Sequence, residues 1–194
     1  MISKLSKKIV NQLNILDDEQ ELYEYGFFIL LSQILYFIIA IIIGTICGTV
    51  FESIIFYIAF QFIRRYAGGY HAATETRCEI LSTLSILACI VVIRLSKTYD
   101  IQTALLIISA LSAVCIFVFC PLDTPEKLLT DKEFRYFRKV SWLILLAIVV
   151  AIIVSYIFKF KIFTVPCCLS LVLESILLTA GKIKRISQKN NVKT

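Results

Sequence analysis

The sequence predicts an all-α, polytopic integral membrane helical bundle. Of the 194 residues, 59% are hydrophobic and only 18% are charged, and the mean hydropathy is +0.85. Soluble domains have about 45–50% apolar and about 25% charged residues. This composition excludes a water-soluble fold, a disordered chain and a nucleic-acid-binding module. The net charge of +6 therefore points to the lipid bilayer as a partner and not to nucleic acid.

About six membrane segments are expected from apolar runs at 26–43, 45–63, 80–93, 101–119, 140–158 and 162–180. The first two runs form one stretch of 38 residues. A single helix of that length would measure about 57 Å, against a hydrocarbon core of about 30 Å. We therefore expect the chain to fold back near Gly44–Gly48. The run 80–93 is the shortest, and it either stays short or borrows residues from 72–79. Four spans with two re-entrant or surface segments remain an open alternative.

The first 25 residues predict an amphipathic helix on the membrane surface and not a cleavable signal. Their apolar residues recur at spacings of three and four, as in one stripe of a helix. The stripe consists of Ile2, Leu5, Ile9, Leu13 and Leu16. We expect a single membrane domain over 1–194, made of this segment (1–25), a membrane bundle (26–180) and a basic cytoplasmic tail (181–194).

The basic residues are distributed unevenly between the connections. Sixteen of the 20 Lys and Arg residues lie in the N-terminal segment, in 64–79, in 120–139 and in 181–194. The connections on the opposite side hold the other four. Because positive residues favour the cytoplasmic side, we expect a multi-pass protein of the cell membrane with both termini and segment 64–79 in the cytoplasm.

The connector 120–139 is the longest polar region. Pro121 and Pro125 should end the preceding helix, and Thr130 and Glu133 have the spacing of a capping box, which predicts a helix that runs to Trp142 at the membrane interface. The basic residues of the connector can dock an acidic substrate tail or bind anionic lipid as topology determinants, and we favour the second interpretation. These residues are Lys127, Lys132, Arg135, Arg138 and Lys139.

Segment 64–79, RRYAGGYHAATETRCE, holds the residues best suited to chemistry. It contains the only histidine, His71, and seven residues later Cys78, the one cysteine with polar neighbours on both sides. The other six cysteines lie within or at the end of apolar runs and predict no disulfide framework. A thiol with an imidazole is the minimum equipment for nucleophilic acyl transfer.

A Cys–His pair at this spacing sets a geometric condition. In an unbroken helix, residues i and i+7 are separated by about 10.5 Å of rise. A reacting pair needs about 3–3.5 Å. The dyad therefore predicts a break between His71 and Cys78 or a crossing of two elements, and Gly68–Gly69 allow a tight bend upstream. The alternative is an interfacial histidine near an unrelated cysteine. A metal site is not expected, because no further His or Cys ligands gather nearby.

In this segment the sequence resembles the accessory gene regulator protein B family, the AgrB-like membrane cysteine peptidases. The family pattern is R-x4-G-x-H-A-x5-C, and the connector sequence PLDTPEK, which includes Lys127, is similar to the family's proline-rich basic loop. The residues in the register of the pattern are Arg64, Gly69, His71, Ala72 and Cys78.

The resemblance implies a membrane-embedded cysteine endopeptidase. Such an enzyme cleaves the C-terminal tail of an AgrD-type quorum-sensing precursor and, through an acyl-enzyme thioester, assists its cyclisation to a thiolactone or lactone autoinducing peptide. By this resemblance Cys78 is the nucleophile and His71 the general base and acid, while Arg64, Gly69 and Lys127 bind substrate or organise the loop. No metal or organic cofactor is implied. A homodimer is compatible with the family, but the sequence does not show it.

Two other functions remain open from the sequence. A small peptide transporter or exporter would account for the membrane segments and for Glu52 and Glu174, which lie within apolar runs where charge is costly. A membrane scaffold is the third interpretation. The two glutamates can also serve as bundle-facing carboxyls that link helices. Glu75 and Glu79 are candidates for a third catalytic residue by proximity alone.

Overall fold

A computed structural model describes residues 5–6, 8–10, 17–70, 74–122 and 129–191. Apart from one isolated bridge, these residues are helical or lie in short connections, which confirms the all-α membrane bundle. Each apolar run corresponds to one long helix. The helices are α2 (Asp17–Cys47), α3 (Val50–Ala67), α4 (Glu75–Leu95), α5 (Gln102–Phe119), α6 (Asp131–Ile157) and α7 (Lys161–Asn191).

The predicted reversal after the first apolar run is confirmed at Gly48. The helix α2 ends at Cys47, Gly48 has a φ of +65°, and α3 begins at Val50. A left-handed φ of this kind is readily adopted by glycine, which has no Cβ. A Cβ at Gly44 would lie 2.7 Å from the Ser53 hydroxyl oxygen, so the two helices approach closely beside the turn.

Two helix starts follow from capping. The helix α4 begins at Glu75, so the helix of the short apolar run 80–93 does include preceding residues. Its N-cap is Thr74, whose side chain accepts a hydrogen bond from the Arg77 backbone N–H at 3.4 Å. The predicted capping box of α6 is confirmed: the Thr130 side chain accepts a hydrogen bond from the Glu133 backbone N–H, and the Glu133 side chain accepts one from the Thr130 backbone N–H. These side chains satisfy N–H groups that the first helical turn leaves without partners.

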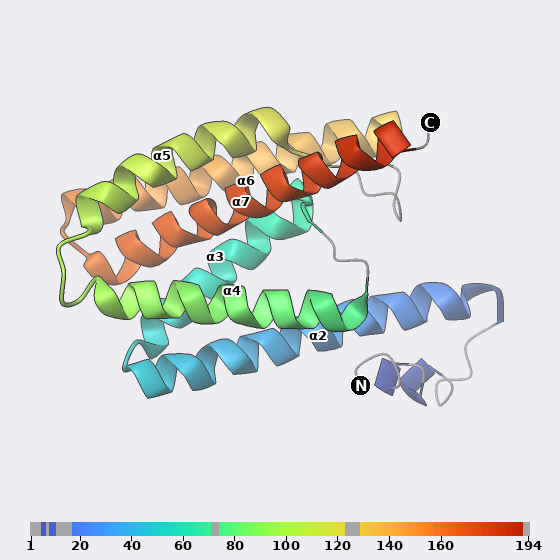
Figure 1. Ribbon diagram of the computed structural model, residues 1–194, viewed down its shortest axis with the longest axis horizontal. Coiled ribbons are helices and arrows are strands. Elements are labelled where there is room, and N and C mark those ends of the chain that lie inside the picture. The colour runs from blue at the N-terminus through green and yellow to red at the C-terminus, as the bar shows by residue number, and fades with distance from the viewer. Residues whose placement is uncertain (1–4, 7, 11–16, 71–73, 123–128, 192–194) are drawn as a thin grey trace.

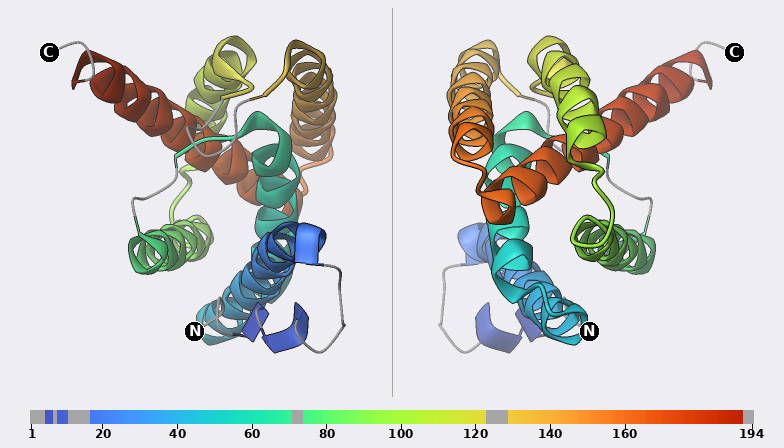
Figure 2. Two further views of the ribbon diagram at one scale, coloured as in Figure 1. Left: turned by 90° about the vertical axis from the view of Figure 1, so that its right-hand side faces the viewer. Right: turned by 90° about the vertical axis from the view of Figure 1, so that its left-hand side faces the viewer.

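The helices form two groups joined by α3. Helices α5, α6 and α7 lie together, α2 packs against α4, and α3 runs between the two groups in contact with α2, α6 and α7 (Figures 1 and 2). By length and composition, five of the described helices can cross a membrane: α2, α4, α5, α6 and α7. The sixth, α3, has 18 residues and carries Glu52, Arg64 and Arg65.

The helix α7 is the most buried of these five, with 67% of its apolar window inside the bundle, against 6% for α2. Small polar residues allow this close packing, since they let helix backbones approach and can bond across the contact. Ser175 of α7 donates to the Ser112 hydroxyl of α5 at 3.0 Å, and Thr164 donates to Ser155 of α6 at 2.9 Å. One face of α2 packs against the core through Tyr36, Phe37 and Ile43, whereas many of its other large apolar side chains are exposed, as expected for a lipid-facing helix.

The alternating helix directions create two ends of the bundle. The Arg64 end comprises the start of α2, the end of α3, the starts of α4 and α6, and the ends of α5 and α7; the Glu52 end comprises the opposite termini (Figure 1). The described parts of segments 64–79, 120–139 and 181–194, all rich in basic residues, thus lie at the Arg64 end. Within the N-terminal segment 1–25, residues 5–6 and 8–10 are helical as predicted, and residues 17–25 form the start of α2.

Candidate functional site

The candidate site begins where α3 ends, at two consecutive glycines. Gly68 has a φ of +80° and Gly69 a φ of +138°, conformations that residues with a side chain rarely adopt. Gly68 forms a single parallel bridge with Leu122, whose N–H donates to the Ala67 carbonyl at 2.9 Å. A Cβ at Gly68 would lie 2.5 Å from the Leu122 carbonyl oxygen. The predicted bend is therefore present and is pinned to the segment after α5.

Arg64 holds the bend from the last turn of α3. Its Nη1 donates to the Gly68 carbonyl at 2.8 Å and its Nη2 to the Tyr70 carbonyl at 2.6 Å. A Cβ built on Gly69 would overlap the guanidinium group. The guanidinium thus fills the concave side of residues 68–70, which we call the glycine loop. The structure therefore brings together Arg64 and Gly69, two residues of the shared pattern.

The helix α7 forms the wall behind the glycine loop. The Tyr70 N–H donates to the Leu177 carbonyl at 3.0 Å. One turn later, Gly181 lets the loop approach: a Cβ there would lie 2.9 Å from the Gly69 carbonyl carbon and 3.0 Å from the Tyr70 nitrogen. The Lys184 ammonium lies 5.3 Å from the Tyr70 ring centroid. The glycine loop is consequently held by α3 and α7 together.

Glu174 of α7 lies beside Arg64. Its side chain is fully buried, and its Oε2 lies 3.8 Å from the Arg64 Nη1. Neither carboxylate oxygen has a hydrogen-bond partner among the described residues. A buried carboxylate is costly unless a cation lies near it. Arg64 is the cation that the structure places there.

Cys78 lies in the first turn of α4 and is half-buried. Its N–H donates to the carbonyl of Thr74, the residue that caps this helix. The side chain of Tyr36 in α2 lies near Ser82, Cys78 and Glu79. The first turn of a helix is an electropositive environment, because its backbone N–H groups point toward the terminus.

The geometric condition on the dyad is met in part. The helix α3 ends at Ala67 and α4 begins at Glu75, so no single helix runs from position 71 to Cys78. His71 and Ala72 lie outside the described residues, as do Lys127, Pro125 and the side chain of Glu75. The distance between His71 and Cys78 is therefore not described.

Cys120 is the other cysteine near the glycine loop, two residues before Leu122. Burial raises the pKa of its thiol. A thiol is a weak nucleophile until it loses its proton, so burial makes Cys120 unsuited to attack a carbonyl. Cys78, by contrast, is half-buried.

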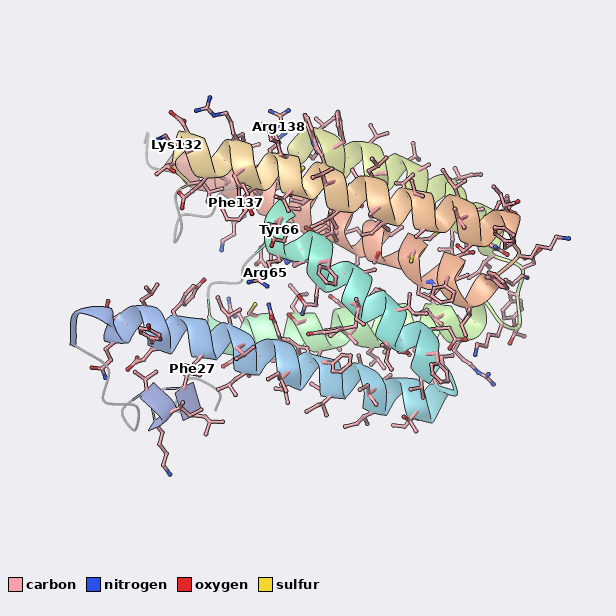
Figure 3. The ribbon with its side chains drawn as sticks, turned by 180° about the vertical axis from the view of Figure 1, so that it is seen from behind. Phe27, Arg65, Tyr66, Lys132, Phe137 and Arg138 are labelled. Carbon is pink, nitrogen blue, oxygen red and sulfur yellow. The ribbon has the colours of Figure 1, made fainter. Side chains whose placement is uncertain are left out.

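Basic and aromatic side chains surround this end of the bundle (Figure 3). The rings of Tyr66 in α3 and Phe137 in α6 lie 5.9 Å apart, and Arg138 lies over the Trp142 ring at 4.8 Å. The Trp142 indole N–H donates to the Phe117 carbonyl, which ties α6 to α5. Arg65 and Lys132 are exposed here. Such side chains can contact lipid headgroups or an acidic peptide.

Glu52 lies at the opposite end of the bundle, away from the glycine loop. Its Oε1 lies 2.7 Å from the Lys97 Nζ, and the same ammonium donates to the Gly48 carbonyl at 3.1 Å. Glu52 and Lys97 line a pocket of about 260 Å³ together with Lys161. The part of the chain that the structure describes has no group of three or more side chains suited to hold a metal ion.

Four residues of the site escaped the sequence analysis: Thr74, Leu122, Gly181 and Tyr36. A threonine three residues before Arg77 is a recognisable cap signal. Leu122 and Gly181 had no such signal, because their importance comes from contacts with residues far away in the sequence.

Comparisons with known proteins identify the family of the chain. A family model described as accessory gene regulator B matches residues 2–178. Two proteins of Clostridium perfringens described as AgrB-like, one from strain SM101 and one from strain 13, are each 26% identical over 151 residues; the match covers 74% of this chain and 71% of theirs. No solved structure matches the chain. The chain therefore belongs to the accessory gene regulator B family, a membership that supports a part in the processing of quorum-sensing peptides.

Proposed function

We propose that the protein is a membrane cysteine endopeptidase that cleaves the C-terminal tail of an AgrD-type precursor and assists cyclisation of the remaining peptide. The observation that carries this proposal is the position of Cys78. It lies in the first turn of a helix that starts only after the glycine loop, within a chain that matches the family from residue 2 to 178.

The first step forms an acyl-enzyme. His71 removes the proton from the Cys78 thiol, and Sγ attacks the carbonyl carbon of the scissile peptide bond. As the C–N bond breaks, the imidazolium returns the proton to the leaving amine, so the tail departs with a free amino terminus. The peptide remains attached to Cys78 as a thioester. The N-terminal turn of α4 supports the thiolate that attacks.

The second step forms the ring. The thiol of a cysteine within the bound peptide attacks the thioester carbonyl, its proton passes to Cys78 through His71, and Cys78 leaves as the free thiol. A serine in place of that cysteine would give a lactone. Exchange between two thioesters is nearly isoenergetic, whereas hydrolysis of the acyl-enzyme by water is favourable. The site must therefore keep water away from the acyl-enzyme. The boundary between bundle and bilayer provides such a location.

The remaining residues have supporting roles. Arg64 and Gly69 organise the loop that leads to His71. Lys127 and its basic neighbours bind the acidic tail of the precursor or the anionic lipid surface. The AgrD-type precursor is the expected partner, and the cytoplasmic placement of the Arg64 end and a homodimer stay predictions.

The test uses the full chain in liposomes with a candidate AgrD-type precursor. Intact mass spectrometry should detect wild-type protein carrying the tail-truncated precursor, and hydroxylamine should remove this adduct. Cys78→Ala should form no adduct, and His71→Ala should form it far more slowly. Cys115→Ala is the matched control, because Cys115 is also half-buried but lies within α5; it should behave like wild type. Undiminished cleavage by Cys78→Ala would overturn the mechanism.

A further inference from the structure

We propose that Glu174 is a positioning residue of the peptidase: its buried carboxylate keeps Arg64 inside the bundle, and Arg64 in turn holds the glycine loop in the conformation that presents His71 to Cys78. The part that concerns catalysis rests on the proposed function. The part that concerns the loop rests on the structure alone.

The first step of the argument is the isolation of Glu174. The carboxylate is fully buried and receives no hydrogen bond from the described residues, so only the nearby guanidinium compensates its charge. Ordinary helix packing does not need a glutamate at such a position, since an apolar residue of similar size would fill it without the cost of desolvation. A carboxyl group at this position therefore needs a partner, and Arg64 is the basic residue that the structure places beside it.

The second step is the position of Arg64. Its side chain is 18% exposed, and it lies in the last turn of α3, close to the end of the bundle. A long basic side chain near a helix end can extend to water or lipid phosphates, where its charge is better solvated. Glu174 opposes that movement, because it offers a negative charge on the inner side.

The third step connects Arg64 to the loop. The two donors of Arg64 that bind the Gly68 and Tyr70 carbonyls belong to one planar group. A guanidinium that moved outward would release both carbonyls at once and leave empty the space beside Gly69. The loop would then be held by the contacts of Tyr70 with α7 and by the Gly68–Leu122 bridge alone. Position 71 directly follows these residues, so the orientation of the general base depends on them.

The experiment measures the loop and the chemistry separately, with the full chain in liposomes. In Glu174→Gln, hydrogen–deuterium exchange of the Tyr70 amide should become about tenfold faster, while exchange along α5 and α6 stays at the wild-type rate. The kcat for precursor cleavage should fall about 100-fold with KM little changed, because misplacement of a catalytic group slows the chemical step more than binding.

Two variants separate positioning from general support of the fold. Glu174→Asp retains the carboxylate and should restore most of the kcat and slow the Tyr70 exchange again. Glu52→Gln is the matched control, because Glu52 is also a buried helix glutamate with a basic partner but lies at the other end of the bundle. It should change neither the Tyr70 exchange nor kcat.

Wild-type exchange of the Tyr70 amide in Glu174→Gln would overturn the inference, and so would a uniform increase along all helices or an equal effect of Glu52→Gln. If wild-type protein forms no acyl adduct with any precursor, the proposed function fails. The exchange measurements then still decide whether Glu174 holds the loop.

Discussion

The guanidinium of Arg64 occupies the space that a side-chain carbon at Gly69 would need. The two residues are five positions apart in the sequence, yet each is accommodated only because of the other. Arg64 can bind both loop carbonyls because Gly69 leaves the concave side of the loop empty. Gly69 can adopt a φ of +138° because it has no Cβ, and the two hydrogen bonds of Arg64 hold it there.

Gly69→Ala should therefore reduce precursor cleavage by about 100-fold, the loss expected when a catalytic group is misplaced. The added methyl group displaces Arg64 and is also strained at this φ. Cleavage assays in liposomes would measure the loss. Gly26→Ala is the control, since a Cβ there meets no atom within 4 Å in α2. Equal activity of Gly69→Ala and wild type would contradict the described loop.

Thr74→Ala should lower kcat about fivefold, because loss of an N-cap costs about 1 kcal/mol and frays the turn that carries Cys78. Thr74→Ser keeps the hydroxyl and should retain full activity. Thr130→Ala removes the cap of α6 instead, so it should reduce thermal stability with little effect on kcat. The cap has no part in catalysis if Thr74→Ala and Thr130→Ala have the same kinetic effect.

Gly181→Ala should impair cleavage even though alanine favours helix formation more than glycine by about 1 kcal/mol. Its Cβ would lie 2.9 Å from the Gly69 carbonyl carbon, so the loop must move away from α7. Leu122→Ala in the same chain should fail to restore activity, because the backbone contacts remain. Circular dichroism would verify that α7 is intact. Restoration by Leu122→Ala would show that the side-chain contact alone matters.

Lys97→Met should destabilise the protein by about 2 kcal/mol, since it leaves the buried carboxylate of Glu52 without its cation. Glu52→Gln should cost less, because the Lys97 side chain is 39% exposed and can reach water. Denaturant titration in detergent micelles would measure both. The free energy of unfolding should be lower for Lys97→Met than for Glu52→Gln. Neither variant should affect precursor cleavage. A lower free energy of unfolding for Glu52→Gln would contradict the assigned pairing.

The orientation in the membrane can be measured with two single substitutions. Thr98→Cys introduces an exposed thiol at the Glu52 end, and Ser187→Cys does so at the Arg64 end. An impermeant maleimide should label Thr98→Cys on intact cells but Ser187→Cys only after permeabilisation, because the basic residues gather at the Arg64 end. The unmodified chain corrects for its own cysteines. The opposite labelling pattern would place the candidate site outside the cell.

The sequence predicted the helices well because their signals are local. Apolar length, the glycines near Gly48 and the Thr130–Glu133 spacing each act within a few residues. The start of α4 was left open, since Thr74 extends the helix beyond its apolar run. Likewise, α7 continues to Asn191, through a polar segment with no hydrophobic run to indicate a helix.

The candidate site was predictable only as a pattern of residue types. The resemblance placed Arg64 and Gly69 beside His71 and Cys78, and the break before α4 followed from the spacing of a reacting pair. The contact between Arg64 and Glu174 joins residues 110 positions apart. No periodicity links such residues, so only the packing of α3 against α7 reveals it.

The division of contacts between α4 and its neighbours has a consequence for how a peptide substrate could enter. The helix α4 packs chiefly against α2, whereas the glycine loop is fastened to α3 and α7. Cys78 is therefore positioned mainly by the contact of α4 with α2, whereas the glycine loop before His71 is positioned by α3 and α7. A small shift of α4 relative to α3 and α7 would move Cys78 relative to the glycine loop without breaking a hydrogen bond inside any helix. A peptide substrate would thus enter at the boundary between α4 and the glycine loop, with Cys78 on one side and the glycine loop on the other.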